Sequence, residues 1–420
     1  MEQRYRLLSL SNSDLILQRS LSLIYASYEN EHRESNDGIA NKDKDFVFDI
    51  HPSLLVDTSK LIIDKFVGEG SHFILYKGWY RLDPVSIKVM LPKNTLDATY
   101  ECKAKFQREV NLISRIKHQN IVKFIGACVE PSMMIITEFL EGGSLQKHLE
   151  NIYPRTLDLE QSLSFALDIS QAMEYLHAND IIHRDLKPGK QWQIHCTHKG
   201  IHGMINLFVG NLVLAEDKMH IKLSEFGMAR EEICGEMTSE AGTYRYMAPE
   251  LLSKEPLPKG EKKCYDHKAD VYSFALVLWG LTKNQIPFKG RSELMAAYAA
   301  VRNMRPSVDE FPNDLLPLLQ SCWAENPNLR PEFAEITNIL TQVLQNFQTK
   351  RTTAPLQEAV SKHMIDEGQS KKNSSGCSTE KQFHSIKVSA SACLPQSKLK
   401  KKINKYKSLV LRFSRCFASF

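Results

Sequence analysis

The chain has 420 residues, 42% of them hydrophobic and 25% charged, so it can bury one large core or two ordinary ones. Its nine cysteines include no Cys-x-x-Cys pair, which argues against a disulfide framework or a zinc ribbon and favours a reducing compartment. The net charge of +5 belongs to the end of the chain, where 15 Lys and Arg stand against 4 Asp and Glu from Lys350 onward. We therefore expect no nucleic-acid partner for the main domain. No apolar run is long enough for a membrane span, and we read no signal peptide.

The order of local patterns predicts one large domain between two extensions. The run 28–38 is too polar to bury a core, so residues 1–60 are expected to be an extension and linker. Strand-like alternation begins at Leu61, and a helical period takes over by Leu159. The predicted domain is 61–346, with a strand-rich part over 61–137, a helical part over 142–346, and a Ser- and Lys-rich tail over 350–420 that is typical of disorder.

The first candidates for chemistry lie in the strand-rich part. Gly68-Glu69-Gly70 separates two strand-like runs, and its glycines would let backbone N–H groups approach anionic oxygens, although an ordinary hairpin turn has the same pattern. Lys88 follows in a strand, and Glu109 lies in a helical stretch that could present its carboxylate to Lys88.

The decisive segment is Ile181-Ile-His183-Arg184-Asp185-Leu186-Lys187-Pro188. Phosphoryl transfer from ATP needs a flexible loop over the phosphates, a cation, metal-binding oxygens and a carboxylate for the attacking hydroxyl, and the chain supplies candidates in that order. Further motifs follow in Glu225-Phe-Gly227, Gly242-Thr-Tyr-Arg-Tyr-Met-Ala-Pro-Glu250, Asp270-Val-Tyr-Ser-Phe and Arg330-Pro. Together these motifs resemble the eukaryotic protein kinases. The resemblance implies an α+β fold with a small, mainly β lobe and a larger, mainly α lobe.

The resemblance also implies roles for single residues. Asp185 would orient the substrate hydroxyl, Lys187 would neutralise the transferring phosphoryl group, and Lys88 paired with Glu109 would hold the α and β phosphates. Lys187 and Thr243 together imply Ser/Thr rather than Tyr substrates, and Glu250 would pair with Arg330. The implied cofactors are ATP and two Mg²⁺ ions, with Gly68, Glu69, Gly70 and Leu75 over the phosphates, Thr137, Glu138 and Leu140 at the adenine hinge, and Asn211 and Glu225 as metal ligands.

Four phrases are similar to the Raf-like MAP kinase kinase kinases of plants. They are Ile125-Gly-Ala, Glu141-Gly-Gly-Ser-Leu, Gly242-Thr-Tyr-Arg-Tyr-Met and Gly260-Glu-Lys-Lys. This similarity implies a protein substrate in intracellular signalling, such as a downstream kinase.

Two departures from the family pattern concern the phosphates and the metal. Phe73 stands where a third glycine is usual, and Leu75 replaces a valine, which predicts poorer cover of the phosphates. Glu225 stands where the family has an aspartate that binds Mg²⁺. Because Mg²⁺ demands near-octahedral oxygens at about 2.0–2.1 Å, the extra methylene of Glu225 is expected to displace the carboxylate.

The third departure is an insertion. Asn211 lies 26 positions after Asp185 instead of the usual five, which leaves 21 extra residues, 190–210. Removing them restores Lys-Pro-Gly-Asn-Leu-Val-Leu, so the insertion could be an unspliced intron of 63 bases. It shows no evident helical or strand period, and it is expected to disorder Asn211 and block protein substrates. An alternative is a zinc site formed by His195, Cys196, His198 and His202, although their spacing fits no familiar site.

Glu225 and the insertion together leave an alternative function open. A catalytically impaired pseudokinase or signalling scaffold would keep the fold and the nucleotide binding while losing phosphoryl transfer.

Regulation is expected in the segment after Gly227, where Arg184 would bind an activating phosphate carried by Thr238 or Ser239, near Thr243. The alternative is that these hydroxyls are ordinary loop residues.

The end of the tail carries a second pattern. Over 398–417, apolar residues recur three or four apart among lysines and arginines, as in a basic amphipathic helix. Such a helix binds anionic membrane or calmodulin, whereas a solvated disordered tail is the alternative. We therefore expect a cytoplasmic protein with peripheral membrane contact through this tail.

Overall fold

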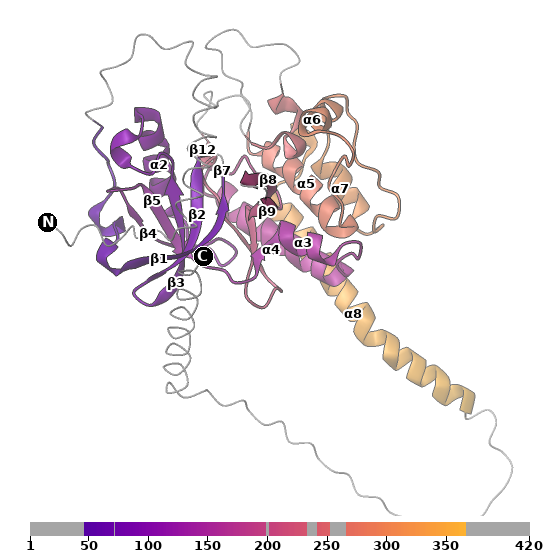
Figure 1. The fold of residues 1–420 in the computed structure, drawn as a ribbon. Coiled ribbons are helices and arrows are strands. Elements are labelled where there is room, and N and C mark those ends of the chain that lie inside the picture. Colours follow the sequence, from indigo (N-terminus) through magenta and orange to yellow (C-terminus); the bar gives the residue numbers. More distant parts are fainter. Residues whose placement is uncertain (1–45, 71, 199–200, 233–241, 253–265, 367–420) are drawn as a thin grey trace, which may run out of the picture. The chain divides into compact units, whose positions relative to one another are not determined.

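A computed structural model describes residues 46–70, 72–198, 201–232, 242–252 and 266–366. The first lobe is a five-stranded antiparallel sheet in the order β1-β2-β3-β5-β4 (Figure 1). Val85, Ile87 and Val89 alternate into one face of the sheet, the period of two that a strand dictates. The strands are β1 (Leu61–Glu69), β2 (Phe73–Tyr80), β3 (Asp83–Met90), β4 (Phe124–Cys128) and β5 (Met134–Glu138).

Helix α2 (Tyr100–Ile113) covers the opposite face of this sheet. It begins at a capped end, where the hydroxyl of Thr99 accepts a hydrogen bond from the N–H of Cys102 at 3.3 Å. Phe106 and Val110 are fully buried and pack with Ile135 of β5. This packing fixes the helix that carries Glu109 beside the strand that carries Lys88.

Residues 46–60 differ from the predicted linker, because they pack against the first lobe. Ile50 is buried in the cluster of Phe106 and Val110, and the N–H of Val56 donates to the carbonyl of Ala127 at 2.9 Å. The apolar residues of this stretch are too few for a periodic signal, so only the folded lobe reveals their partners. The lobe therefore begins before residue 61.

The second lobe is mainly helical, and its core is helix α5 (Lys268–Lys283). Every residue from Ala269 to Leu281 is buried, as expected for a helix that is apolar on all sides. The predicted α+β two-lobed fold is confirmed. The other helices are α3 (Leu145–Ile152), α4 (Leu159–His177), α6 (Glu293–Val301), α7 (Leu316–Cys322) and α8 (Phe333–Asp366), and the short strands are β6 (Gly143–Ser144), β7 (Ile181–Ile182), β10 (Leu212–Leu214), β11 (Ile221–Leu223) and β12 (Arg230–Glu231).

The insertion folds as a β-hairpin, contrary to the prediction that it lacks regular structure. Strands β8 (Lys190–His198) and β9 (Ile201–Val209) pair antiparallel, with Lys190 opposite Val209 and His198 opposite Ile201. Trp192, Ile194 and Cys196 alternate with polar residues along β8. This alternation is typical of a strand, and the prediction from composition did not take it into account. Strand β9 lies beside β1 of the first lobe.

The boundary predicted at residue 350 also differs from the structure. Helix α8 continues to Asp366, because residues after Lys350 still include many helix formers and the Ser- and Lys-rich composition begins later. The rest of the tail, including 398–417, lies outside the described residues. Among the described residues, no helix combines the length and apolar character needed to cross a membrane.

A buried ion pair ties the second lobe together, as the sequence predicted. The side chain of Arg330 has 0% exposure and donates from Nη1 and Nη2 to the two carboxylate oxygens of Glu250, at 2.6 and 2.8 Å. Arg330 also donates to the carbonyls of Ala324 and Lys268. These bonds join the segment before α5 to the segment before α8.

Removing this arginine should strongly destabilise the protein. We expect Arg330→Met to lower the free energy of unfolding by about 3–5 kcal/mol, because Glu250 would keep a mostly buried charge without its partner. The control is Lys105→Met, whose ion pair with Glu101 is exposed and should change stability by less than about 1 kcal/mol. Chemical denaturation measures both, and equal effects would contradict a structural role for Arg330.

Candidate functional site

A pocket between the two lobes brings together most of the residues predicted to bind nucleotide. Gly68 and Glu69 end β1, and Gly70 follows them at the turn to β2, where its N–H donates to the carbonyl of Phe73 at 2.9 Å. The Phe73 ring lies so close to Gly70 that a Cβ there would come within 2.4 Å of it, and the ring would have to move. The pocket is lined by Leu75, Lys88, Glu109, Thr137, Glu138, Leu140 and Glu225, among others.

Lys88 lies between two carboxylates at the back of this pocket. Its Nζ donates to Oε1 of Glu109 at 2.7 Å and to Oε2 of Glu225 at 2.9 Å. Burial alone would lower the pKa of Lys88, but the charges of Glu109 and Glu225 outweigh it and raise that pKa above its usual range. Burial raises the pKa of Glu225, partly opposed by Lys88. Lys88 is therefore a fixed cation, held where the resemblance requires one.

Phe73 also contacts this lysine. Its ring lies over Nζ of Lys88, 4.4 Å from the ring centroid, in a cation–π arrangement. A glycine at this position could make no such contact. The departure noted in the sequence thus places an aromatic ring against Lys88, the cation predicted to hold the phosphates.

The hinge residues line the pocket, but the side chain of Glu138 is engaged elsewhere. Its Oε1 accepts from Nζ of Lys222 at 2.6 Å and from the N–H of Lys123 at 2.8 Å. Thr137 pairs with Ser86 in the ladder between β3 and β5. Any contribution of Glu138 to adenine binding would therefore come from its backbone.

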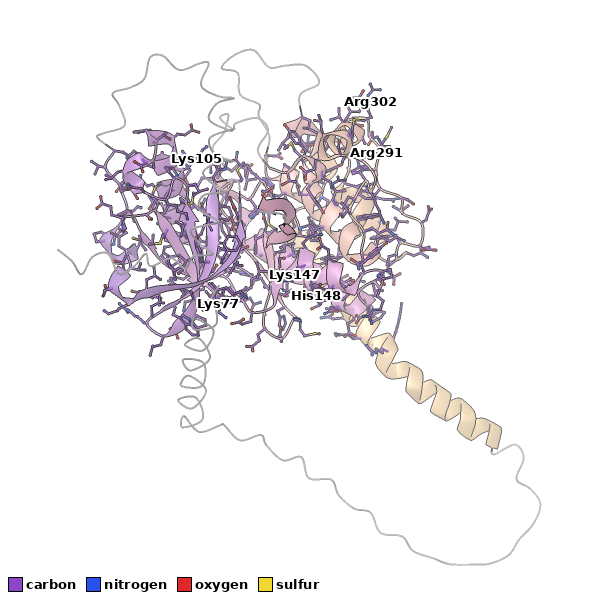
Figure 2. All side chains as sticks on the ribbon, viewed as in Figure 1. Lys77, Lys105, Lys147, His148, Arg291 and Arg302 are labelled. Atoms are coloured by element: carbon purple, nitrogen blue, oxygen red, sulfur yellow. The ribbon has the colours of Figure 1, made fainter. Side chains whose placement is uncertain are left out.

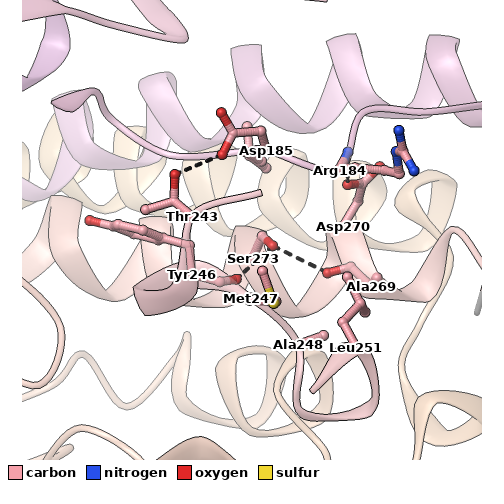
Figure 3. A pocket seen from close by; sticks show the side chains of 11 residues that line it. Arg184, Asp185, Thr243, Tyr246, Met247, Ala248, Leu251, Ala269, Asp270 and Ser273 are labelled. Atoms are coloured by element: carbon pink, nitrogen blue, oxygen red, sulfur yellow. Dashed lines mark hydrogen bonds between the residues drawn. The ribbon is translucent and has the colours of Figure 1, made fainter. Parts of the chain in front are cut away.

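Asp185 is the centre of a hydrogen-bond network, and it lines a second, small pocket together with Arg184, Thr243 and Asp270. Lys187 donates from Nζ to Oδ2 of Asp185 at 2.6 Å, and the hydroxyl of Thr243 donates to Oδ1 at 2.8 Å. Figure 3 shows Thr243 and Asp185 facing each other. Lys187 also donates to the hydroxyl of Thr243. Lys187 and Thr243, the two residues behind the Ser/Thr prediction, thus contact each other and Asp185.

Asn211 belongs to the same network, contrary to the prediction that the insertion disorders it. The residue is 3% exposed, and its Nδ2 donates to the carbonyl and to Oδ2 of Asp185, at 2.6 and 2.9 Å. Gly210 packs closely on Ser144, where a Cβ would lie 2.6 Å from the Cβ of Ser144. Because the hairpin strands pair from their first to their last residue, the chain returns to this point in register.

Asp270 has a role that the sequence did not reveal. Its two carboxylate oxygens accept from the backbone N–H groups of His183 and Arg184, each at 2.8 Å, and Oδ2 lies 3.0 Å from Nε2 of His177. Arg184 adopts φ 67°, a left-handed conformation that costs a non-glycine residue about 1–2 kcal/mol. The motif beginning at Asp270 was visible in the sequence, but its partners lie more than 80 positions away.

The side chains present fit a divalent cation of the magnesium type. The amide nitrogen of Asn211 is turned to Asp185, which leaves its oxygen Oδ1 for a metal, and Glu225 uses Oε2 for Lys88, which leaves Oε1. Amide and carboxylate oxygens are the donors that Mg²⁺ takes. Glu225 has φ 65°, and Phe226 beside it is buried against the ring of His183, with centroids 5.7 Å apart.

The regulatory residues are described only in part. Arg184 donates from Nε to the carbonyl of Met228 at 2.6 Å, at the start of the segment that follows Glu225. Thr238 and Ser239 lie outside the described residues. The phosphosite assignment therefore stays a prediction.

Comparison with known proteins decides the family. The model of the protein tyrosine and serine/threonine kinase family matches residues 61–189 and 194–340. The chain belongs to this family. In Arabidopsis thaliana it is similar to serine/threonine/tyrosine-protein kinase HT1, 37% identical over 289 residues, which cover 68% of this chain and 66% of HT1. Serine/threonine-protein kinase STY17 is 36% identical over 294 residues (69% of this chain, 46% of STY17), and STY46 is 36% identical over 281 residues (66% and 43%).

These matches confirm the resemblance to protein kinases. All three relatives carry kinase names, so the comparisons do not favour the pseudokinase alternative. This chain spans about two thirds of HT1 and less than half of STY17 and STY46. The family match begins at residue 61 and is interrupted at residues 190–193, within the insertion.

Shortening Glu225 should improve the site. We expect Glu225→Asp to raise the rate of Mg²⁺-dependent phosphoryl transfer by about tenfold to a hundredfold, because a carboxylate misplaced by about 1 Å costs on that order. The matched control is Glu231→Asp, the same change at a half-exposed residue of β12. Radiolabelled phosphate transfer to a generic protein measures the rates. An unchanged or lower rate would mean that the site is built around glutamate.

Proposed function

We propose that this protein is an ATP-dependent serine/threonine kinase acting on protein substrates. In the reaction, the substrate hydroxyl oxygen forms a bond to the γ-phosphorus of ATP as the bond between that phosphorus and the β–γ bridging oxygen of ADP breaks. The hydroxyl proton passes to a carboxylate. The observation that carries the proposal is the network in which Lys187, Asn211 and Thr243 all donate to Asp185.

The role proposed for each residue follows from the contacts that it makes. Asp185 is the carboxylate that would orient the hydroxyl and take its proton, since three donors hold its oxygens in one orientation. Lys187 would neutralise the transferring group from beside it. Lys88, held by Glu109, would contact the α and β phosphates below the turn of Gly68 and Gly70.

Asn211 and Glu225 are the residues proposed to hold Mg²⁺. When bound there, Mg²⁺ would neutralise charge on the phosphate oxygens. The chain's own part is to keep both side chains in place, through the Asp185 bonds of Asn211 and the Lys88 bond of Glu225.

The insertion is proposed to reduce activity without disrupting the fold. It leaves the chain between Gly189 and Asn211, and its strand β9 lies beside β1, the strand that leads into the glycine turn. A hairpin at this place would hinder the binding of a protein substrate and the movement of the glycine turn.

The splicing hypothesis adds that a normal transcript lacks the codons for these 21 residues. Sequencing transcripts across the junction tests it, and only long forms in several tissues would contradict it.

A transfer assay on two forms of the protein tests the proposal. We expect the form lacking residues 190–210 to phosphorylate a generic protein substrate at least tenfold faster than the full chain, because the catalytic loop then has its usual length. Asp185→Asn in each form is the blank. Phosphoamino-acid analysis of the product should find phosphoserine and phosphothreonine.

The other outcomes are equally informative. If neither form exceeds its blank while ATP still raises the melting temperature, the protein is a nucleotide-binding scaffold and the kinase proposal is wrong. Equal rates above the blank in the two forms would contradict the inhibitory role of the hairpin and would support the kinase proposal.

For the wider context we propose a cytoplasmic kinase whose substrate is a downstream kinase. The support is the similarity of four of its sequence motifs to those of MAP kinase kinase kinases.

The segment 398–417 is proposed to bind anionic membrane, with calmodulin as the alternative partner. Its basic residues predict that binding to phosphatidylserine vesicles falls steeply with salt, as cosedimentation can measure. Binding to neutral vesicles of the same strength would contradict an electrostatic mode.

A further inference from the structure

The segment Phe46–Val56 contacts helix α2 through both its backbone and its aromatic side chains. The N–H of Asp49 donates to Oε1 of Gln107 at 2.7 Å, and the carbonyl of Asp49 accepts from Nδ2 of Asn111 at 3.1 Å. Gln107 and Asn111 lie four positions apart on α2, so they share one face of the helix. One residue of the segment thus bonds to two successive turns of α2.

Aromatic packing extends this contact along the helix. The ring of Phe48 meets the ring of Phe106 edge to face, with centroids 5.9 Å apart. Phe46 meets Tyr100 at 5.0 Å and Phe48 at 5.0 Å, also edge to face. Such ring pairs contribute about 0.5–1.5 kcal/mol each beyond the burial of their area.

The segment alternates in the way that a strand does. Phe48 is partly buried against the α2 cluster and Ile50 is 8% exposed, whereas Val47 between the phenylalanines is 85% exposed. The contact is therefore specific to one face of the segment.

The other end of the segment is bound to the sheet. The N–H of Val56 donates to the carbonyl of Ala127 in β4 at 2.9 Å, and Leu55 forms a parallel bridge with the same residue. A Cβ on Gly126 would come within 2.4 Å of Cγ1 of Val56, so this glycine lets the segment lie directly on β4. The segment therefore joins α2 to the sheet on which Lys88 lies.

Glu109 lies on α2 between the two residues that bond Asp49. Its bond to Lys88 depends on the rotation and distance of α2 relative to β3, and a shift of about 1 Å would break the 2.7 Å contact. We infer that Phe46–Val56 is a positioning element for nucleotide binding, which acts by holding α2 so that Glu109 meets Lys88. The main positioning residues are Phe48 of the segment and Gln107 of α2, which bonds to Asp49 of the segment. This segment precedes the family match, which begins at residue 61.

The inference deepens the proposed function but can be tested without phosphoryl transfer. We expect Phe48→Ala and Gln107→Ala in the full chain to weaken ATP binding in the presence of Mg²⁺ by about threefold to tenfold. Phe48→Leu should retain most of the affinity, because it keeps apolar contact with Phe106. The matched control is Val47→Ala, which should leave affinity unchanged. A fluorescent ATP analogue displaced by ATP measures the affinities.

A double-mutant cycle with Glu109→Gln separates positioning from general stability. If the segment acts through Glu109, Phe48→Ala should have little further effect on ATP affinity once Glu109 is changed. An equal loss in both backgrounds would overturn the inference. This experiment measures ATP affinity alone. Its result can therefore be interpreted even if the separate assay detects no phosphoryl transfer.

Hydrogen exchange supplies a measurement that needs no nucleotide. We expect Phe48→Ala and Gln107→Ala to speed amide exchange in α2 by tenfold or more, with no change in α4 or α5. Faster exchange throughout the protein would show a merely structural role and overturn the inference. Unchanged exchange in α2 would overturn it as well.

Discussion

The carboxylate of Asp270 holds the backbone around Arg184 in the conformation from which the Asp185 network is built. It accepts the backbone N–H groups of His183 and Arg184, and so fixes Arg184 in a left-handed conformation that the chain would otherwise avoid. Burial alone would raise the pKa of Asp270, but the hydrogen bond from His177 and the neighbouring donors lower it, so the group stays an anion. Asp185 follows directly, and Lys187, Asn211 and Thr243 donate to it.

A second ionic centre joins three elements that are distant in sequence. Lys88 comes from β3, Glu109 from α2 and Glu225 from the segment after β11, and all three meet within hydrogen-bond distance. Two carboxylates around one lysine leave a net negative charge, which a divalent cation on the remaining oxygen of Glu225 would offset. Glu225 would then serve two partners, Lys88 through Oε2 and the cation through Oε1.

The sequence predicted which residues come together better than it predicted where the folded parts begin and end. Asp185, Lys187, Thr243 and Asn211 could be found because local motifs carry them, and the structure brings them into contact. The role of Asp270 could not be predicted from the residues alone, since its partners depend on how α5 meets the catalytic loop. The packing of Ile50 and the length of α8 were missed for a related reason, because a few apolar residues become informative only beside the surface that covers them. The hairpin was missed although the alternation along β8 was present.

The ladder between β8 and β9 brings the two ends of the insertion together. Because Lys190 lies opposite Val209, the two ends of the added segment leave the lobe side by side, and Gly210 still packs on Ser144. The closure entropy is met within the hairpin itself and not by the catalytic loop. A segment whose termini are adjacent, such as a reporter domain, would keep the spacing of the two anchors at this position. The loop that carries Asp185 thus contains an insertion site at which a new segment can replace the hairpin while the fold is kept.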